Sequence, residues 1–295
     1  MFPILLAETE APPSLGYAPH VVLALYLLML LGLGIAGWLK GSNTEEDYYL
    51  AGRGQGLLVT ALTIMATYFS GVALLGFPGA VYTNGIAAMF FALNVPVAGA
   101  AVYLLGNGIR KLGRARGYVT PADMLADYYG GGAIRLLAAL MGALYVLPYV
   151  IIQIKAGGTL AASLFADTGS LSIFGLELSM YDAGATALSI VTMVYVLIGG
   201  MRSVAWTDVV QGLLLLFGCL LAGVAVIVSL GGVGGFFSEV AKLDSGNLTL
   251  HDPAVSKFNP WWMMTFCVFG SLASIVQPAQ WMRFYSARSS KTLRN

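Results

Sequence analysis

The stretch LLVTALTIMATYFSGVALLGFPGAVYTNG, residues 57–85, decides the fold. It is long enough to cross a bilayer, but its middle turns polar at 67–71, and Gly76, Pro78 and Gly79 follow. Proline removes a hydrogen-bond donor and glycine loosens the backbone, so amides and carbonyls here lose their helical partners. In hydrocarbon those groups must bind neighbouring helices, water, or an ion and its solute, as they do at the midplane of transporters. The sequence therefore predicts an interrupted membrane helix, and a kink filled by neighbouring side chains is the alternative.

The composition is that of a polytopic membrane protein. Hydrophobic residues make up 58% and charged residues 10% of the 295 residues, and the mean hydropathy is +0.80, far more apolar than a soluble chain. The 37 glycines fit the same class, because small residues let membrane helices approach closely. The net charge of +1 gives no positive sign of nucleic-acid binding, and no nucleic-acid partner is expected.

The cysteine and histidine content excludes some chemistry. Cys219 and Cys267 lie in apolar runs and are predicted to pack without forming a disulfide. The only histidines, His20 and His251, lie at the edges of hydrophobic spans, which excludes histidine catalysis in the membrane interior. The spans hold neither paired acids nor a His-Glu-x-x-His motif, and the chain has no Gly-x-x-x-x-Gly-Lys-Ser/Thr loop. Neither an intramembrane enzyme nor ATP binding is therefore expected.

Seven hydrophobic spans of about membrane length are predicted in a single all-α transmembrane domain. They follow an exterior tail at 1–19 and cover residues 20–39, 57–82, 86–108, 133–166, 183–200, 203–230 and 260–285. With the N-terminus outside, twelve Lys or Arg residues fall on the cytoplasmic side and only Lys242 and Lys257 fall outside. Because cytoplasmic loops are enriched in Lys and Arg, we expect a plasma-membrane protein with its N-terminus outside and the end of this chain inside.

The connections between spans carry helix signals of their own. In the basic cytoplasmic loop 109–132, Thr120-Pro121-Ala122-Asp123 predicts a capped short helix over 121–129. Asn259-Pro260 repeats the cap and proline before the last span. The exterior loop 231–258 leaves room for a short helix, and its glycosylation sequon at 247–249 is predicted to stay unmodified.

The fourth span is longer than a perpendicular crossing needs and carries Gln153 and Lys155 near its centre. Lys155 is the one cation placed deep inside a span. An ionisable group at that depth is costly enough to be treated as functional, so it can attract a substrate carboxylate or hold a nearby acid. The alternative is that its long side chain reaches the interface or pairs structurally.

The run 199–211 joins the fifth and sixth spans by a tight cytoplasmic turn. Asp208 and Gln211 then lie one helical turn apart at the start of the sixth span. The acid can cap the helix, pair with a basic residue, or attract a cation leaving for the cytoplasm. Spacing alone favours the pairing.

A second interruption is predicted in the last span, where Gln277-Pro278 follows Ser271 and Ser274 and precedes Arg283. The two interrupted spans are five apart, the offset expected when a five-helix unit is repeated with inverted topology. The predicted units are an extra helix at 20–39, a first repeat at 57–230 and the start of a second repeat at 260–285.

These segments resemble the sodium/solute symporter family. The most specific match is Gly-Gly-x-x-x-Val-x-x-Thr-Asp-x-x-Gln at 199–211, and the others lie at 49–53, 66–71, 76–79, 119–123, 277–278 and 283–284. The resemblance implies the LeuT-type inverted-repeat fold with one extra N-terminal helix. It also implies that Na⁺ is the coupling ion for uptake of a small organic solute across the lipid bilayer.

The resemblance further implies site residues. The backbone carbonyls of Ala66 and Phe69 would be metal ligands to sodium, and Asp208 would lie on the sodium release route. The solute would be bordered by Thr67, Tyr68, Ser70, Gln153 and Gln277, with Lys155 added from its depth in the span. Family members carry further helices, one of which completes the sodium site with hydroxyl groups, so this chain is expected to be incomplete at its C-terminus.

Two functions remain open. Gln153, Lys155 and the tyrosines favour a carboxylate solute for a sodium-coupled symporter, such as a monocarboxylate, an amino acid or a pantothenate-like acid. The alternative is a membrane sensor module of the same fold that binds solute and signals to a partner. The sequence beyond Asn295 would separate the two.

Overall fold

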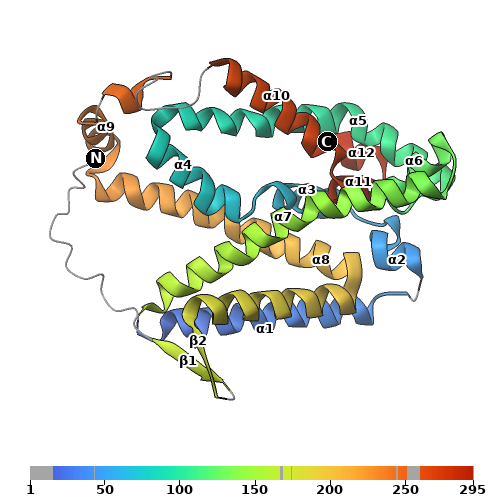
Figure 1. The fold of residues 1–295 in the computed structure, drawn as a ribbon, viewed down its shortest axis with the longest axis horizontal. Coiled ribbons are helices and arrows are strands. Elements are labelled where there is room, and N and C mark those ends of the chain that lie inside the picture. Colours follow the sequence, from blue (N-terminus) through green and yellow to red (C-terminus); the bar gives the residue numbers. More distant parts are fainter. Residues whose placement is uncertain are drawn as a thin grey trace.

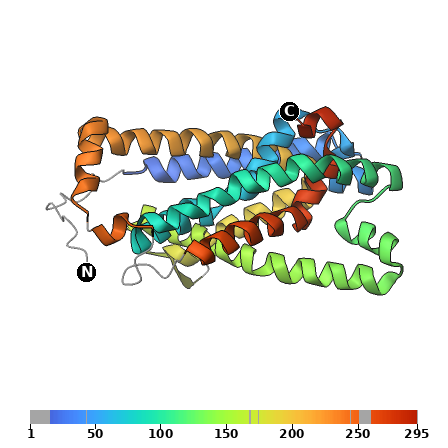
Figure 2. The ribbon, with the colours of Figure 1, turned by 90° about the horizontal axis from the view of Figure 1, so that it is seen from above.

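The computed structural model describes residues 16–42, 44–166, 169–173, 175–243, 245–250 and 260–294. The first fifteen residues of the predicted exterior tail, the Asn259 cap and the side chains of Ser271 and Ser274 lie outside the described parts. The described chain is almost wholly helical, and most of its long helices run roughly along the long axis of the molecule (Figures 1 and 2).

The first half of the chain forms α1 (Ala18–Leu39), α2 (Glu45–Leu50), η1 (Ala51–Arg53), α3 (Leu57–Tyr68), η2 (Val72–Gly76), α4 (Phe77–Asn84), η3 (Gly85–Leu93), α5 (Asn94–Arg116), α6 (Pro121–Tyr129) and α7 (Gly132–Leu164). The second half forms β1 (Ser170–Ile173), β2 (Leu176–Ser179), α8 (Met180–Ser229), α9 (Gly232–Ala241), η5 (Ser245–Leu248), α10 (Pro260–Val276), α11 (Pro278–Ser286) and α12 (Ser290–Arg294).

Four of the described helical stretches are long and apolar enough to cross a membrane: α1, the run Val72–Arg116, α7 and α8. α8 holds two predicted spans, because Gly200 (φ 55°, ψ −153°) turns the chain back within it (Figure 1). A Cβ at this glycine would lie 2.5 Å from the carbonyl oxygen of Tyr48, so the turn needs glycine for both its conformation and its space. The predicted tight turn is confirmed.

Both predicted interruptions are present. α3 ends at Tyr68, Phe69 is extended (φ −85°, ψ 111°), and helical structure resumes with the π-helical turn η2. In the last span Gln277 (φ −59°, ψ 127°) separates α10 from α11. The second break follows from Pro278, because a proline disfavours helical angles in the residue before it.

The capped helix predicted over 121–129 is confirmed as α6. Asp123 Oδ2 accepts hydrogen bonds from the backbone amides of Val119 (3.0 Å) and Thr120 (2.8 Å). Proline at the first helical position loses nothing, because its missing donor has no partner there. The short helix for which the exterior loop left room is also present, as α9.

One part of the predicted organisation was wrong, and one element was not predicted. Residues 109–116 are not a loop but the end of α5, because they are good helix formers and Gly117 (φ 73°) is the residue that ends the helix. The segment between the fourth and fifth spans holds an unpredicted antiparallel hairpin, with Ser170 opposite Ser179.

The two largest fully buried side chains among the described residues, Tyr285 and Phe284, lie where α11 meets α5. The Tyr285 ring is buried against Gly113, where a Cβ would come within 2.2 Å of the ring. Arg110 donates to the carbonyls of Ala287 and Arg288, each at 2.8 Å. Elsewhere many large apolar side chains of α7 and α8 are exposed, as expected of helices that face lipid.

Candidate functional site

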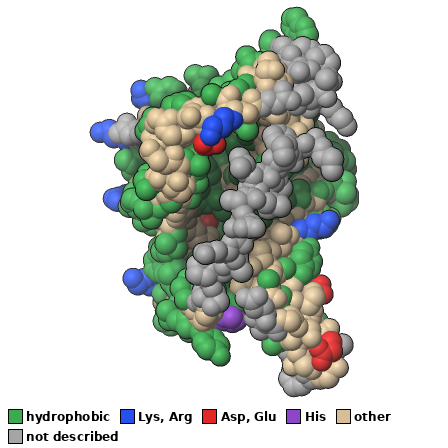
Figure 3. Space-filling view, turned by 90° about the vertical axis from the view of Figure 1, so that its left-hand side faces the viewer, with side chains coloured by type: hydrophobic (Ala, Val, Ile, Leu, Met, Phe, Trp, Pro, Cys, Tyr) green, Lys and Arg blue, Asp and Glu red, His purple; other side chains and the backbone are tan. Residues whose placement is uncertain are grey.

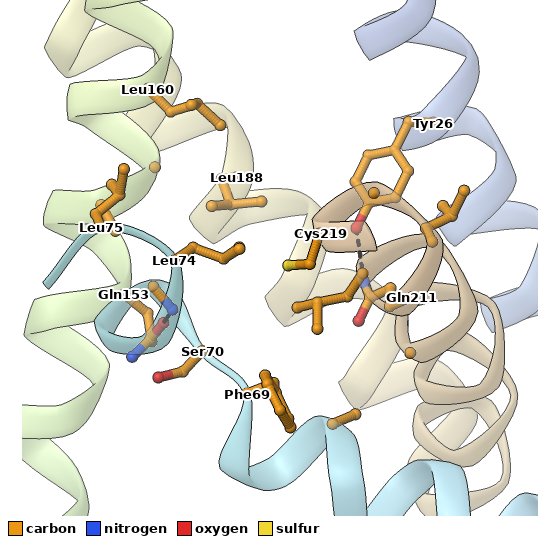
Figure 4. Close-up of a pocket in the computed structure, with 18 of the residues that line it drawn as sticks. Tyr26, Phe69, Ser70, Leu74, Leu75, Gln153, Leu160, Leu188, Gln211 and Cys219 are labelled. Atoms are coloured by element: carbon orange, nitrogen blue, oxygen red, sulfur yellow. Dashed lines mark hydrogen bonds between the residues drawn. The ribbon is translucent and has the colours of Figure 1, made fainter. Parts of the chain in front are cut away.

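A cavity of about 640 Å³ lies between α1, α7, α8 and the break after α3 (Figure 4). Leucines of η2, α7 and α8 supply much of its wall. The hydroxyl and carboxamide side chains that line it are those of Tyr26, Ser70, Gln153 and Gln211, and none of its lining residues is charged. A solute bound here would meet a few hydrogen-bonding groups and no fixed charge.

The backbone at the break directs its amides away from the helical pattern. The amide of Gly71 donates to Gln153 Oε1 at 2.8 Å. The next two amides donate to Ser70, one to its hydroxyl at 3.2 Å and one to its carbonyl at 2.9 Å. In an unbroken helix these three amides would bind the carbonyls of residues 67–69. The break therefore releases carbonyls from their helical donors beside the cavity.

Four of the predicted site residues come together here. Ala66 lines the cavity from the last turn of α3. Phe69 and Ser70 line it from the break, and Gln153 lines it from α7 (Figure 4). Backbone carbonyls can replace water around a cation without adding a buried charge. The residues present therefore fit part of a sodium site, with oxygen ligands supplied by the main chain.

Three other predicted residues do not line the cavity. The Thr67 hydroxyl donates back along its own helix to the carbonyl of Thr63, at 2.7 Å. Tyr68 is half-buried in the last turn of α3. Lys155 is exposed on α7.

Gln277 lies in a different place from the cavity. Its Nε2 donates to the hydroxyl of Tyr145 at 2.5 Å. Together with Pro278 it lines a separate, mostly apolar groove of about 920 Å³ between α6, α7 and the start of α11. The two helix breaks thus contact α7 at different points along its length, through Tyr145 and through Gln153 eight residues further on.

Asp208 is held in an ion pair. Its Oδ2 lies 2.9 Å from Arg283 Nη2, and the two side chains are only 13% and 9% exposed. The Thr63 hydroxyl also donates to this carboxylate, and Arg283 Nε donates to the Thr63 carbonyl at 3.0 Å. Spacing alone favoured a pairing for Asp208, but the partner comes from the far end of the chain and could not be identified from local sequence.

Tyr26 is a cavity residue that the sequence did not single out. Its hydroxyl accepts a hydrogen bond from Gln211 Nε2 at 2.7 Å (Figure 4). A signal was present, because Tyr26 is the only residue with a polar side chain in 21–37. A tyrosine inside a membrane span needs a partner for its hydroxyl.

Two interrupted helices set beside long membrane helices define a multi-pass membrane protein of the LeuT-type fold. The same fold is found in a Na⁺-coupled sialic acid symporter solved in a substrate-bound, outward-open state. The TM-score is 0.75 at 22% sequence identity, and the match covers 95% of this chain and 55% of that one.

The chain belongs to the sodium:solute symporter family, whose model matches residues 48–295. It is 33% identical over 233 residues to the sodium/proline symporter of Escherichia coli (strain K12), covering 78% of this chain and 44% of that protein. It is 27% identical over 277 residues to the sodium/pantothenate symporter of the same organism, covering 92% of this chain and 54% of that protein. The family resemblance read from the motifs is confirmed, and the chain spans about half the length of these relatives.

Proposed function

We propose that this chain forms the part of a sodium-coupled symporter that holds its coupling ion and a small organic solute at the break after α3. The observation that carries the proposal is that the amide of Ala73 donates to the Ser70 carbonyl, which leaves the Phe69 carbonyl beside the cavity without its helical donor. A helix that only anchors a protein in the membrane keeps its carbonyls hydrogen-bonded within the helix. Carbonyls without helical donors can instead bind a cation.

Ala66 and Phe69 are the proposed sodium ligands, through their backbone carbonyls. Both residues line the cavity at the point where the helical pattern stops. One positive charge that moves through a potential of 100 mV supplies about 2.3 kcal/mol. That free energy concentrates a neutral solute about fiftyfold.

The proposed solute is a small zwitterion such as an amino or imino acid. No residue that lines the cavity carries a charge, and Lys155 lies outside its wall. Burying a net charge without a partner costs more than burying a solute whose charges cancel. A proline-like solute therefore fits the wall better than a pantothenate-like anion, although relatives are named for each of these solutes.

We further propose that the N-terminus is outside and that the end where α2, α6 and α11 meet is cytoplasmic. Basic residues gather there: Arg53 donates to the Tyr118 carbonyl, and Arg202 pairs with Asp47. Figure 3 looks onto the opposite end of the molecule, where charged side chains are scattered among apolar ones. A concentration of Lys and Arg at one end is the sign of a cytoplasmic surface.

Uptake of labelled L-proline and of labelled pantothenate by cells that express the protein would test the function. We expect proline uptake to depend on Na⁺ and to be abolished by Ala66→Trp, which fills the site. Ala61→Trp is the matched control, because Ala61 is exposed on the same helix. Uptake that is equal in sodium and choline media, or equal loss in both variants, would contradict the proposal.

A further inference from the structure

We propose that α1 is a working part of the solute cavity, and that Tyr26 positions the Gln211 carboxamide in the cavity wall. The role of the cavity rests on the proposed function. The family model matches residues 48–295 and so does not include α1, yet α1 contributes Tyr26 to the wall. Tyr26 is therefore a part of the cavity wall that lies outside the residues matched by the family model.

The contact between α1 and α8 is fixed at two points. The Ser203 hydroxyl donates to the Gly34 carbonyl at 3.0 Å, and Gln211 Nε2 donates to the Tyr26 hydroxyl at 2.7 Å. Gly34 and Tyr26 are eight residues apart in α1, and Ser203 and Gln211 are eight residues apart in α8. The two contacts therefore belong to one antiparallel register. Eight residues are about two turns, which places both contacts on the same face of each helix.

The close contact leaves α1 little freedom to slide along α8. A Cβ at Gly37 would lie 2.0 Å from Ser203 Oγ, and a Cβ at Gly34 would lie 2.8 Å from that of Tyr195. Glycine at both positions allows close approach of the backbones, as at other membrane helix contacts. The position of Tyr26 along α8 is therefore set by the helix contact.

The hydrogen bond determines what Gln211 presents to the cavity. A primary carboxamide has a donor nitrogen and an acceptor oxygen. One N–H of Gln211 is donated to Tyr26, which fixes the orientation of the carboxamide and leaves its oxygen as an acceptor and its second N–H as a donor for a solute. Without the tyrosine hydroxyl the carboxamide could rotate, and the wall would no longer offer a fixed acceptor.

The first experiment needs no solute. In a Cys267→Ser background, Cys219 is the only thiol, and it lines the cavity. We expect Tyr26→Ala to speed alkylation of Cys219 by a water-soluble maleimide several-fold, because the Tyr26 ring lines the same cavity as this exposed thiol and its loss widens the approach from the α1 side. Tyr17→Ala is the matched control, since Tyr17 is 84% exposed at the start of the same helix. Equal alkylation rates in the two variants would overturn the assignment of α1 to the wall.

The second experiment measures Na⁺-dependent affinity for L-proline, with Tyr26→Phe, Gln211→Leu and the double variant. Tyr26→Phe should weaken binding about fivefold, the worth of one neutral hydrogen bond, and Tyr17→Phe should leave it unchanged. If Tyr26 acts through Gln211, the double variant binds as Gln211→Leu does alone. A further loss in the double variant would overturn the positioning role. If Tyr26 were merely structural, Tyr26→Phe would lower the thermal stability together with the affinity.

The two experiments also separate this inference from the proposed function. If the unaltered chain shows no Na⁺-dependent proline binding, the proposed function fails. The alkylation rates then still decide whether α1 closes the cavity.

Discussion

Arg283 of α11 and Asp208 of α8 form a buried ion pair across the end of the bundle, with Nη2 and Oδ2 2.9 Å apart. The Thr63 hydroxyl from α3 shares the same carboxylate. One acid therefore joins the second half of α8 to both interrupted spans. A role for Asp208 on the sodium release route remains a prediction. Its role in holding the helices together can be tested directly.

Asp208→Asn should destabilise the protein by about 3 kcal/mol, because it leaves the Arg283 guanidinium buried without a counter-charge. The measurement is the thermal midpoint of the detergent-solubilised protein, followed by size-exclusion chromatography. Asp182→Asn is the control, since Asp182 is an exposed acid in the first turn of the same helix. A midpoint for Asp208→Asn that matches the control would show that the pair does not hold the helices together.

Gln153→Leu should weaken Na⁺-dependent solute binding by about tenfold. It leaves the amide of Gly71 without its acceptor, and an unsatisfied buried donor costs about 1–3 kcal/mol. Lys155→Leu, two residues along α7, is the matched control because that side chain is exposed away from the cavity. A larger effect at position 155 than at 153 would restore the hypothesis that the lysine meets the solute carboxylate.

Gly113→Ala should lower the free energy of unfolding by about 1–3 kcal/mol, because the added methyl group would overlap the Tyr285 ring. A Cβ at position 113 would lie 2.2 Å from that ring, whereas a Cβ at Gly108 of the same helix meets nothing within 4 Å. Gly108→Ala should therefore be neutral or slightly stabilising. Thermal midpoints of the two variants check the prediction, and equal losses would contradict the packing described for α5 and α11.

The hairpin β1–β2 should loosen in acid. The Ser170 hydroxyl donates to Glu177 at 2.6 Å, and this bond, with a second one from Ser172, lowers the pKa of the Glu177 carboxyl. A lowered pKa in the folded state means that the contribution to stability is present above the pKa of the unfolded chain and is lost as the pH falls through the folded value. Protection factors for amide exchange in the hairpin, measured at pH 7 and pH 3, check this, and Ser170→Ala should remove part of the difference.

The interruptions could be predicted from the sequence because their causes are local. Pro278 acts on the residue before it, and the polar run after Met65 cannot be buried in hydrocarbon as an ordinary helix turn. The cap at Thr120 and the tight turn at Gly200 are local in the same sense. These features could therefore be predicted without knowing which helices are neighbours.

The assembly of the site could not be predicted in full, because it depends on how each helix is rotated. Gln153 and Lys155 lie at the same depth, but residues two apart in a helix point about 200° apart, so one lines the cavity and the other does not. The hydrogen bonds of Asp208 with Arg283 and of Gln211 with Tyr26 join segments that are distant in the sequence. The hairpin had a local signal that was not used, because polar and apolar residues alternate in SLSI (170–173) and LELS (176–179) on either side of Gly175.

The close register between α1 and α8 has a mechanical consequence. Backbones that meet at glycines, with a hydrogen bond two turns further on, resist shear, so the pair should travel as one rigid body through any rocking motion of the bundle. Spin labels placed across this seam should keep a constant separation in every condition, which makes α1 the natural fixed frame for measuring displacement of the interrupted helices.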